Sequence, residues 1–199
     1  MKILFLKSGS IPDPLISWLK DDKDNKVTVF EKNISKQQII SINPDIVISY
    51  NYRFLIKKDV IKLLPKKIIN LHIAYLPWNR GAHPNLWSFL KNTPKGVTIH
   101  LIDKGIDTGD ILLQKDLKFD NSRESLNSSY MKLHRVIQDL FKKNWDKMKE
   151  FKIKPKVQKT GGSIHTVGDF DKIQKIIPKD WNITINKLLI KYKSLKNAN

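Results

Sequence analysis

The sequence predicts an α/β fold in which helices flank a mostly parallel β-sheet. Across the first 118 residues, short apolar runs typical of strands alternate with segments that repeat apolar residues at helical spacing. The run at 45–50 is almost continuously apolar, as is typical of a parallel strand buried on both faces. A long amphipathic segment after residue 122 predicts a helix with one buried face.

Three strands and three helices are expected in the first third of the chain. Asp13 should cap the first helix, with Pro14 in its first turn, and Ser35 should cap a short second helix that ends at Ile42. The third helix is expected around 57–64. The expected strands are 2–6, 26–30 and 45–50.

The remaining sequence predicts three more strands, at 68–72, 97–102 and 110–117, and a helix that opens at Pro84. Ser122 should begin the long helix, which at 1.5 Å per residue would reach about 42 Å by Glu150. Beyond it, proline and a Gly-Gly pair separate short apolar pieces. We therefore expect a main domain at 1–150 and a small C-terminal appendage at 151–199 packed on it.

The composition excludes several kinds of site. The chain has no cysteine, so disulfides, thiolate zinc sites and cysteine nucleophiles are excluded, and no metal site is predicted. The amino-terminal apolar run is shorter than the roughly 7–15 residues of a signal-peptide core. No later run approaches the ~20 apolar residues of a membrane span. We expect a cytoplasmic protein with no membrane contact.

The positive charge raises an alternative function, that of a lysine-rich nucleic-acid-binding protein, because strong basicity is a usual feature of that class. The formal net charge is +18, with 37 lysines and arginines in total. Arginine is rare among them, and the lysines are spread through every segment, which is typical of a solvated surface. We therefore expect no nucleic-acid partner. The charge remains compatible with attraction for small anions.

Polar residues occur where connecting loops of an α/β sheet converge. Asn70 and His72 end one predicted strand, and their spacing of two points both side chains to one face. Asp107 lies in the loop after another strand, so an amide, an imidazole and a carboxylate could meet. Each also has a structural interpretation: a hydrogen-bonded strand-end histidine, or an Asx turn from Asp107 to Gly109.

Two longer stretches carry a family resemblance. NLHIAYLPWNRGAHPNLWSFL at 70–90 contains Asn-x-His-x-x-x-Leu-Pro, and GVTIHLIDKGIDTGDILLQ at 96–114 contains Asp-x-Gly-x-Asp-x-Gly. Together they resemble the folate-dependent formyltransferases, which include glycinamide ribonucleotide and methionyl-tRNA formyltransferases. The resemblance implies a Rossmann-like formyltransferase fold, with 1–150 as catalytic domain, and it implies that Asn70, His72 and Asp107 are catalytic.

The resemblance also implies a reaction, in which an amine attacks the formyl carbon of N10-formyltetrahydrofolate. Asn70 would donate to the formyl oxygen as it gains charge. His72 would donate to it as well, or take the proton that leaves the amine, and Asp107 would orient the imidazole. The folate is expected between two loops, comprising Tyr50, Asn51, Tyr52, Arg53 and Phe54 in the first and Asp103, Lys104, Gly105 and Ile106 in the second.

The acceptor is narrowed by further likeness to sugar N-formyltransferases. The stretches SYNYRFLI and GGSIHTVGDFDKI, with Gly-Ser-Ile-His at 162–165, look most like that branch. The resemblance implies a dTDP- or UDP-linked 4-amino-4,6-dideoxyhexose as the acceptor, with glycinamide ribonucleotide as the alternative. A tRNA acceptor is not expected, because the length leaves no room for the second domain of methionyl-tRNA formyltransferases.

The acceptor-binding residues are assigned by position. Lys7, Ser10 and Arg80 are candidates for the diphosphate, while Tyr75 and Trp78 would stack on the base or sugar, or simply pack their own loop. One residue departs from a common variant of the family motif, which has Asp where this chain has His83. A homodimer contact through the C-terminal segment is left open.

Overall fold

The computed structural model describes residues 1–9 and 13–197, which form two compact units. The first unit contains Met1–His72, Ile99–Leu113 and Gln138–Gln158. The second contains Ile73–Thr98, Gln114–Ile137 and the residues from Lys159 onward. Each unit thus combines segments from distant parts of the chain. The expected domains at 1–150 and 151–199 stay a prediction.

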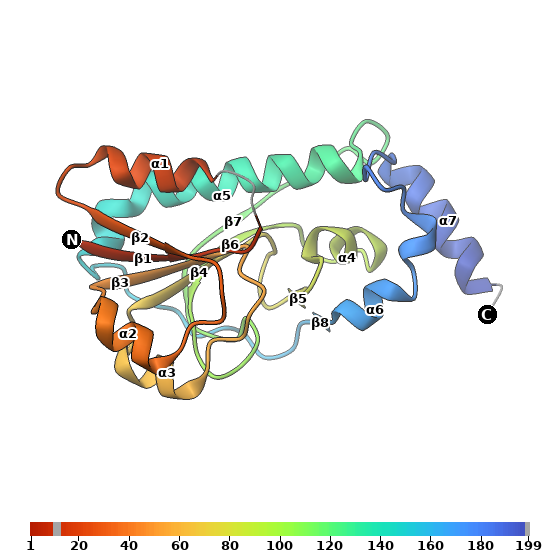
Figure 1. Ribbon diagram of the computed structural model, residues 1–199. Helices are drawn as coiled ribbons and strands as arrows, with labels where there is room; N and C mark the ends of the chain where they lie inside the picture. Colours follow the sequence, from red (N-terminus) through yellow and green to blue (C-terminus); the bar gives the residue numbers. More distant parts are fainter. Residues whose placement is uncertain (10–12, 198–199) are drawn as a thin grey trace. The chain divides into compact units, whose positions relative to one another are not determined.

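A six-stranded sheet has the strand order β2-β1-β3-β4-β6-β7 (Figure 1). Its strands are β1 (Lys2–Leu6), β2 (Lys26–Phe30), β3 (Ile46–Tyr50), β4 (Ile68–His72), β6 (Gly96–Leu101) and β7 (Ile111–Asp116). The first four are parallel: Ile3 pairs with Val27 of β2 and Ile46 of β3, and Val47 pairs with Ile68 of β4. The predicted mostly parallel α/β fold is confirmed.

β6 runs in the direction opposite to its neighbour β4. The backbone N–H of Ile102 donates to the carbonyl of Ile68, at the start of β4, at 2.9 Å. His100, which lies two residues before Ile102, contacts Asn70, which lies two residues after Ile68. The connection after β6 therefore begins beside the start of β4, and loop 103–109 must turn back along β4 to approach its carboxyl end.

Three helices connect the parallel strands: α1 (Pro14–Asp21), α2 (Lys36–Ile42) and α3 (Lys58–Leu63). The Asp13 carboxylate accepts from the Leu15 N–H at 2.9 Å, so the predicted cap of α1 is present. Ser35 caps α2 within a capping box, in which Gln38 Oε1 accepts from the Ser35 N–H at 2.8 Å. These local bonds fix where both helices begin.

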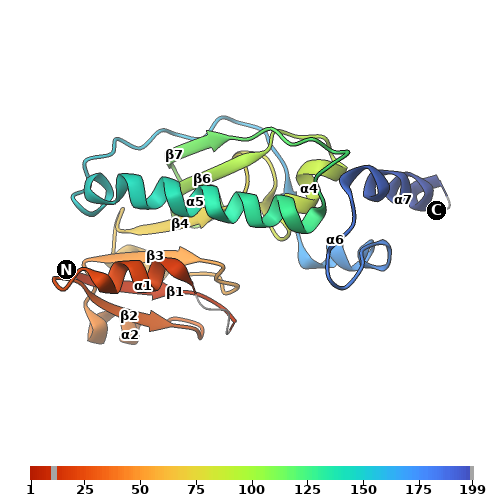
Figure 2. The ribbon, with the colours of Figure 1, turned by 90° about the horizontal axis from the view of Figure 1, so that it is seen from above.

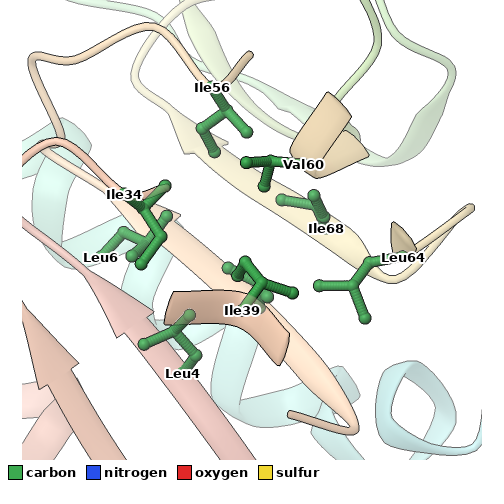
Figure 3. Packing of buried hydrophobic residues seen from close by; sticks show 9 residues of the cluster. Leu4, Leu6, Ile34, Ile39, Ile56, Val60, Leu64 and Ile68 are labelled. Carbon is green, nitrogen blue, oxygen red and sulfur yellow. The ribbon is translucent and has the colours of Figure 1, made fainter. Parts of the chain in front are cut away.

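One face of the sheet is covered by α2 and α3 (Figure 1). Their aliphatic side chains meet those of β1, β3 and β4 in a buried cluster, most of which Figure 3 labels. The cluster consists of Leu4, Leu6, Ile34, Ile39, Val47, Ile56, Val60, Leu64 and Ile68. Its strand members alternate along β1, as expected where each face of a sheet packs against helices.

The long helix α5 (Leu126–Lys149) begins four residues later than expected. Ser125 caps it instead of Ser122: the Ser128 N–H donates to Ser125 Oγ at 3.0 Å, and the Ser125 N–H donates to Ser128 Oγ at 2.9 Å. Ser122 instead closes a turn with Asp120, donating to its Oδ1 through N at 2.9 Å and Oγ at 2.6 Å. The helix is therefore about 36 Å long.

The later part of α5, from Gln138 on, belongs to the first unit and packs with α1 on the other face of the sheet (Figures 1 and 2). The Trp18 ring of α1 meets Phe141 at 6.2 Å and Trp145 at 6.5 Å, both edge-on. None of the helices in residues 1–9 and 13–197 is both long and apolar enough to cross a membrane.

The second unit is built around helix α4 (Pro84–Leu90). Leu86 and Phe89 of α4 are buried with Ile185 and Leu188 from the C-terminal helix. The other elements of this unit are β5 (Arg80–Gly81), which pairs in parallel with β8 (Ile164–His165), then α6 (Val167–Asp171), the 3-10 turn η1 (Gln174–Ile176) and α7 (Ile185–Asn197). The C-terminal residues thus share one apolar core with α4.

A buried histidine on α5 predicts how the stability of the protein depends on pH. His134 is 8% exposed, with the Tyr130 ring 4.2 Å away, and burial lowers its pKa from 6.5 to about 4. Below pH 6.5 the unfolded chain binds a proton that the folded protein excludes. We therefore expect the free energy of unfolding to fall by roughly 3 kcal/mol between pH 7 and pH 4 from this group.

Urea unfolding at a series of pH values measures this loss, with His134→Gln as the comparison. The variant lacks the titrating ring, so its stability should vary less between pH 6.5 and 4. An unchanged pH dependence in His134→Gln would show that other groups cause it.

Candidate active site

The carboxylate of Asp107 lies at the centre of a polar cluster in the first unit. Its Oδ1 accepts from Asn70 Nδ2 at 3.1 Å and lies 3.4 Å from His100 Nε2, while its Oδ2 lies 3.6 Å from His72 Nδ1. The side chains of His72, His100 and Asp107 are 9%, 1% and 14% exposed. The structure therefore brings the three residues predicted as catalytic together, where solvent screens charges weakly.

His100 is the member of this cluster that the sequence analysis missed. Its Nδ1 lies 2.8 Å from the Leu101 carbonyl oxygen, which can only accept, so Nδ1 carries the proton. In a neutral ring Nε2 is then an acceptor, and Asn70 Nδ2, at 3.1 Å, donates to it. Both amide protons of Asn70 are therefore directed to His100 and Asp107.

His72 approaches the carboxylate with its Nδ1 nitrogen. The separation of 3.6 Å between Nδ1 and Asp107 Oδ2 is long for a hydrogen bond but suits an ion pair when the ring is protonated. The His72 and His100 rings lie edge to face at 6.3 Å. With Nδ1 turned to Asp107, Nε2 of His72 is the ring nitrogen that does not face the carboxylate.

Loop 103–109 holds Asp107 in a conformation unusual for a residue with a side chain. Asp107 has a φ of 51°, in the left-handed region. Asp103 Oδ1 ties the loop internally, accepting from the Gly105 N–H at 3.0 Å and Thr108 Oγ1 at 2.5 Å. Glycine is required at 109, because a Cβ there would lie 1.8 Å from the Leu101 carbonyl oxygen. In this motif Asp103 stabilises the loop, Asp107 carries the carboxylate of the cluster, and Gly109 allows the close approach to Leu101.

The loop after β3, predicted to border a folate, is tied to the loop after β1. The Ser8 N–H donates to the Asn51 carbonyl at 3.0 Å, and the Arg53 N–H donates to Ser8 Oγ at 3.1 Å. Asn51 and Arg53 are exposed, and the Arg53 guanidinium lies 4.9 Å from the centre of the Phe54 ring. The exposed side chains of Asn51 and Arg53 are therefore open to a ligand.

The two tyrosines of the same loop are engaged inside the protein. Tyr50 is 1% exposed and accepts at its hydroxyl from Gln138 Nε2 at 3.3 Å. Tyr52 donates from its hydroxyl to the Lys32 carbonyl at 2.6 Å and accepts from the Ile34 N–H at 2.9 Å, and burial raises its pKa. Both hydroxyl groups are thus bonded to other parts of the protein.

Two residues assigned to an acceptor diphosphate lie near the end of β1 in the sequence. The Lys7 side chain is 10% exposed, with Nζ 3.5 Å from Glu31 Oε1. This carboxylate offsets part of the lysine charge, so a diphosphate at Lys7 would compete with Glu31. Ser10 lies outside the described residues.

The segment Gly-Ser-Ile-His at 162–165 pairs with the loop that follows the Asn-x-His motif, within the second unit. Ser163 Oγ accepts from the Asn79 N–H at 2.9 Å, and the Ser163 carbonyl accepts from the Arg80 N–H at 2.9 Å. Further along, the Ala82 N–H donates to the His165 carbonyl at 2.8 Å. This segment therefore acts as a brace for loop 77–82.

The remaining acceptor candidates lie in this braced loop or just before it. Tyr75, Trp78 and Arg80 are all half-buried, and the Trp78 N–H donates to the Tyr75 carbonyl at 3.1 Å. The Tyr75 ring packs so closely on β6 that a Cβ at Gly96 would lie 2.9 Å from it. For Tyr75 this contact favours the packing interpretation over stacking on a substrate.

His83, the departure from the family motif, is an aromatic packing residue. It precedes α4 with a φ of 51° and makes no side-chain cap. Its ring stacks on Phe170 at 4.0 Å and lies 5.6 Å from Trp181, and burial lowers its pKa. An aspartate at this position could not form the stack. The histidine therefore packs with Phe170 and Trp181 of the C-terminal segment.

The family can be decided from the whole sequence together with this geometry. A sequence model of the formyl transferase family matches residues 3–143, more than half of the chain. The chain belongs to the formyl transferase family. The match contains β2 to β7, nearly all of β1 and all four members of the polar cluster, so the family assignment and the cluster concern the same part of the molecule.

A solved structure covers nearly the whole chain. The formyltransferase PseJ from Anoxybacillus kamchatkensis, in complex with UDP-4,6-dideoxy-4-formamido-L-AltNAc and tetrahydrofolate, is 38% identical, with a TM-score of 0.87. The likeness covers 96% of this chain and 100% of that one. The resemblance inferred from the two motifs is confirmed.

Curated relatives are longer proteins. Methionyl-tRNA formyltransferase of Finegoldia magna is 35% identical over 131 residues, which is 60% of this chain and 42% of that protein. The bifunctional polymyxin resistance protein ArnA of Wigglesworthia glossinidia brevipalpis is 30% identical over 180 residues, 85% of this chain and 26% of that protein. The chain thus spans less than half the length of these relatives.

The brace at 162–165 yields a prediction, because two adjacent glycines there have nearly the same φ but different surroundings. Gly161 and Gly162 have φ values of 90° and 91°, but a Cβ at 161 meets nothing within 4 Å, while one at 162 would lie 2.1 Å from the Pro77 carbonyl oxygen. Alanine at either position incurs the backbone strain, and only Gly162→Ala adds the collision. We expect Gly162→Ala to be less stable than Gly161→Ala by roughly 1–3 kcal/mol.

Thermal and urea unfolding of the two variants measures this difference. Equal stability of Gly161→Ala and Gly162→Ala would contradict the close approach of Gly162 to Pro77.

Proposed function

We propose that the protein transfers a formyl group from N10-formyltetrahydrofolate to the amino group of a nucleotide-linked 4-amino-4,6-dideoxyhexose. The likeness to PseJ carries this proposal, because it extends over that whole chain at 38% identity. The complex of PseJ contains a UDP-linked 4-formamido-4,6-dideoxy sugar. A 4-formamido group is a formylated 4-amino group, and this favours a UDP-linked acceptor over a dTDP-linked one.

The chain offers suitable groups for the folate. A flat pterin ring with several donors and acceptors can pair with polar groups, and the predicted loops contain exposed polar residues such as Asn51 and Arg53. Exposed apolar side chains accompany these loops, with Leu55 63% and Ile106 47% exposed, and they can cover the ring. When bound, the folate would supply the formyl carbon. Loops 50–54 and 103–106 would hold the folate.

His72 is the residue best placed to move a proton. Asp107 faces its Nδ1, so a neutral ring with the proton on that nitrogen presents Nε2 as an acceptor for the proton that leaves the attacking amine. The imidazolium formed in this way is stabilised by the carboxylate, which is mostly shielded from water. Protonated His72 can then donate a hydrogen bond to the formyl oxygen as it gains negative charge. It can pass its proton to N10 of the folate as the bond between N10 and the formyl carbon breaks, which releases tetrahydrofolate.

Asn70 has two roles that compete for the same protons. Its amide donates to His100 and Asp107, which orients both side chains. Donation to a formyl oxygen requires that one of these bonds be exchanged for one to the substrate. During such an exchange Asp107 keeps its contact with His72, whose Nδ1 lies 3.6 Å from Oδ2.

Transfer to methionyl-tRNA is the second candidate function. The relatives that carry this name support it, with 35% identity for the Finegoldia magna protein. The match with the Finegoldia magna protein covers 60% of this chain. The likeness to PseJ covers 96% of this chain and therefore favours the sugar.

We expect His72→Ala and Asp107→Asn to lose most turnover while the protein remains folded, because they remove the proton carrier and the group that orients it. Asn70→Ala should lose about 10²–10³ in rate if the amide meets developing charge on oxygen. The matched control is Asp116→Asn, which changes an exposed carboxylate in β7, the strand beside β6. Steady-state rates and circular dichroism check these outcomes, and near-normal rates in all three site variants would reject the assignment.

The acceptor can be identified by offering several amines with N10-formyltetrahydrofolate and following release of tetrahydrofolate. We expect kcat/KM to be highest for a UDP-linked 4-amino-4,6-dideoxyhexose and lower for the dTDP-linked sugar. Methionyl-tRNA and glycinamide ribonucleotide should be formylated poorly. If either of these two were the better substrate, the sugar proposal would be wrong while the formyl transfer would stand.

A further inference from the structure

Gln158 contacts the loop that carries Asp107. This glutamine lies in the segment after α5, within the same compact unit as the polar cluster. Its side-chain Nε2 donates to the main-chain carbonyl of Asp107 at 2.8 Å and to that of Gly109 at 2.7 Å. One amide group thus bridges two carbonyls on either side of Thr108.

The segment that carries Gln158 is itself fixed. Lys156 and Ile111 exchange two main-chain hydrogen bonds, at 2.7 and 2.8 Å, so the segment forms a bridge to the first residue of β7. Gln158 is half-buried, whereas its neighbour Val157 is 82% exposed. The glutamine therefore reaches loop 103–109 from a fixed position on the sheet.

Two features of the loop make this contact consequential. Asp107 has a left-handed backbone, which residues with a side chain rarely adopt, so bonds outside the residue must hold it there. The direction of its carboxylate depends on that backbone. Because this carboxylate faces Asn70, His72 and His100, a change at Asp107 would disturb the whole cluster.

We propose that Gln158 is a positioning residue for formyl transfer, which fixes the Asp107 backbone and thereby aims its carboxylate at His72 and Asn70. The proposal rests on the proposed function, since it assigns Asp107 to the proton transfer. Gln158 acts through Asp107 and not through the substrate. Its loss should therefore lower kcat and leave the KM for the acceptor nearly unchanged.

Gln158→Leu and Gln158→Glu test the two donated bonds. Leucine removes all polar contact at similar size, and glutamate places a second oxygen beside two carbonyls where the amide had donated. We expect kcat to fall about 10–100-fold in both, with the acceptor KM within about threefold, since small misplacements of reacting groups cost rates of this order. Val157→Ala, an exposed change at the adjacent position, is the matched control and should keep the wild-type kcat.

A double variant separates positioning from general destabilisation. If Gln158 acts only through the Asp107 carboxylate, Gln158→Leu should cause less than about a twofold further loss of kcat in an Asp107→Asn background. Multiplication of the two losses would overturn the proposal, as would a wild-type kcat for Gln158→Leu or a change confined to KM.

A readout without substrate distinguishes failure of this inference from failure of the proposed function. Amide hydrogen–deuterium exchange of peptides covering 103–110 should be faster in Gln158→Leu than in the wild type, while peptides from β1 and β3 should be unchanged. Unchanged exchange at 103–110 would overturn the positioning role, whichever amine the enzyme formylates.

Discussion

The polar centre of the molecule depends on one mostly buried carboxylate that several side chains share. Asp107 is 14% exposed at its side chain, and Asn70, His72 and His100 all approach it within 3.6 Å. A carboxylate in such surroundings is costly unless neighbouring donors compensate for lost water. Donation from the Asn70 amide supplies part of this compensation, and His72 supplies more when its ring is protonated.

Sheet topology makes this arrangement possible. β4 contributes Asn70 and His72 two positions apart, while antiparallel β6 brings His100 beside Asn70. The loop after β6 must then return along β4, and the close approach of Gly109 to the Leu101 carbonyl permits that turn. The parallel strands supply the buried platform, and the reversed strand with its loop supplies the carboxylate.

Local rules predicted the parts of the fold that depend on local interactions. Asp13 and Ser35 cap their helices as expected, because a capping side chain bonds to residues two or three positions away. Two serines, Ser122 and Ser125, are both suitable caps for α5. The sequence prediction takes Ser122, but in the structure that serine bonds to Asp120 instead. The spacing of Asn70 and His72 correctly indicated a shared face.

The interactions that sequence reasoning missed are all long-range. His100 lies inside an apolar strand, where a single polar residue has no obvious role. Its spacing of two from Thr98, which places both polar side chains on one face of the strand, was the local signal that could have indicated a second histidine in the cluster. Gln158 contacts a loop about fifty positions earlier in the chain, through main-chain carbonyls that leave no trace in the sequence. The direction of β6 also depends on pairing, which periodicity alone cannot indicate.

The most direct test of the cluster as the place of formyl transfer is a crystal structure with tetrahydrofolate and a UDP-linked 4-formamido-4,6-dideoxy sugar. The formamide should lie within hydrogen-bonding distance, about 3.5 Å, of His72 Nε2 or Asn70 Nδ2. Asp107 should remain between the two histidine rings. A formamide bound more than roughly 10 Å from all of these side chains, beyond the reach of proton transfer through one water, would contradict the assignment.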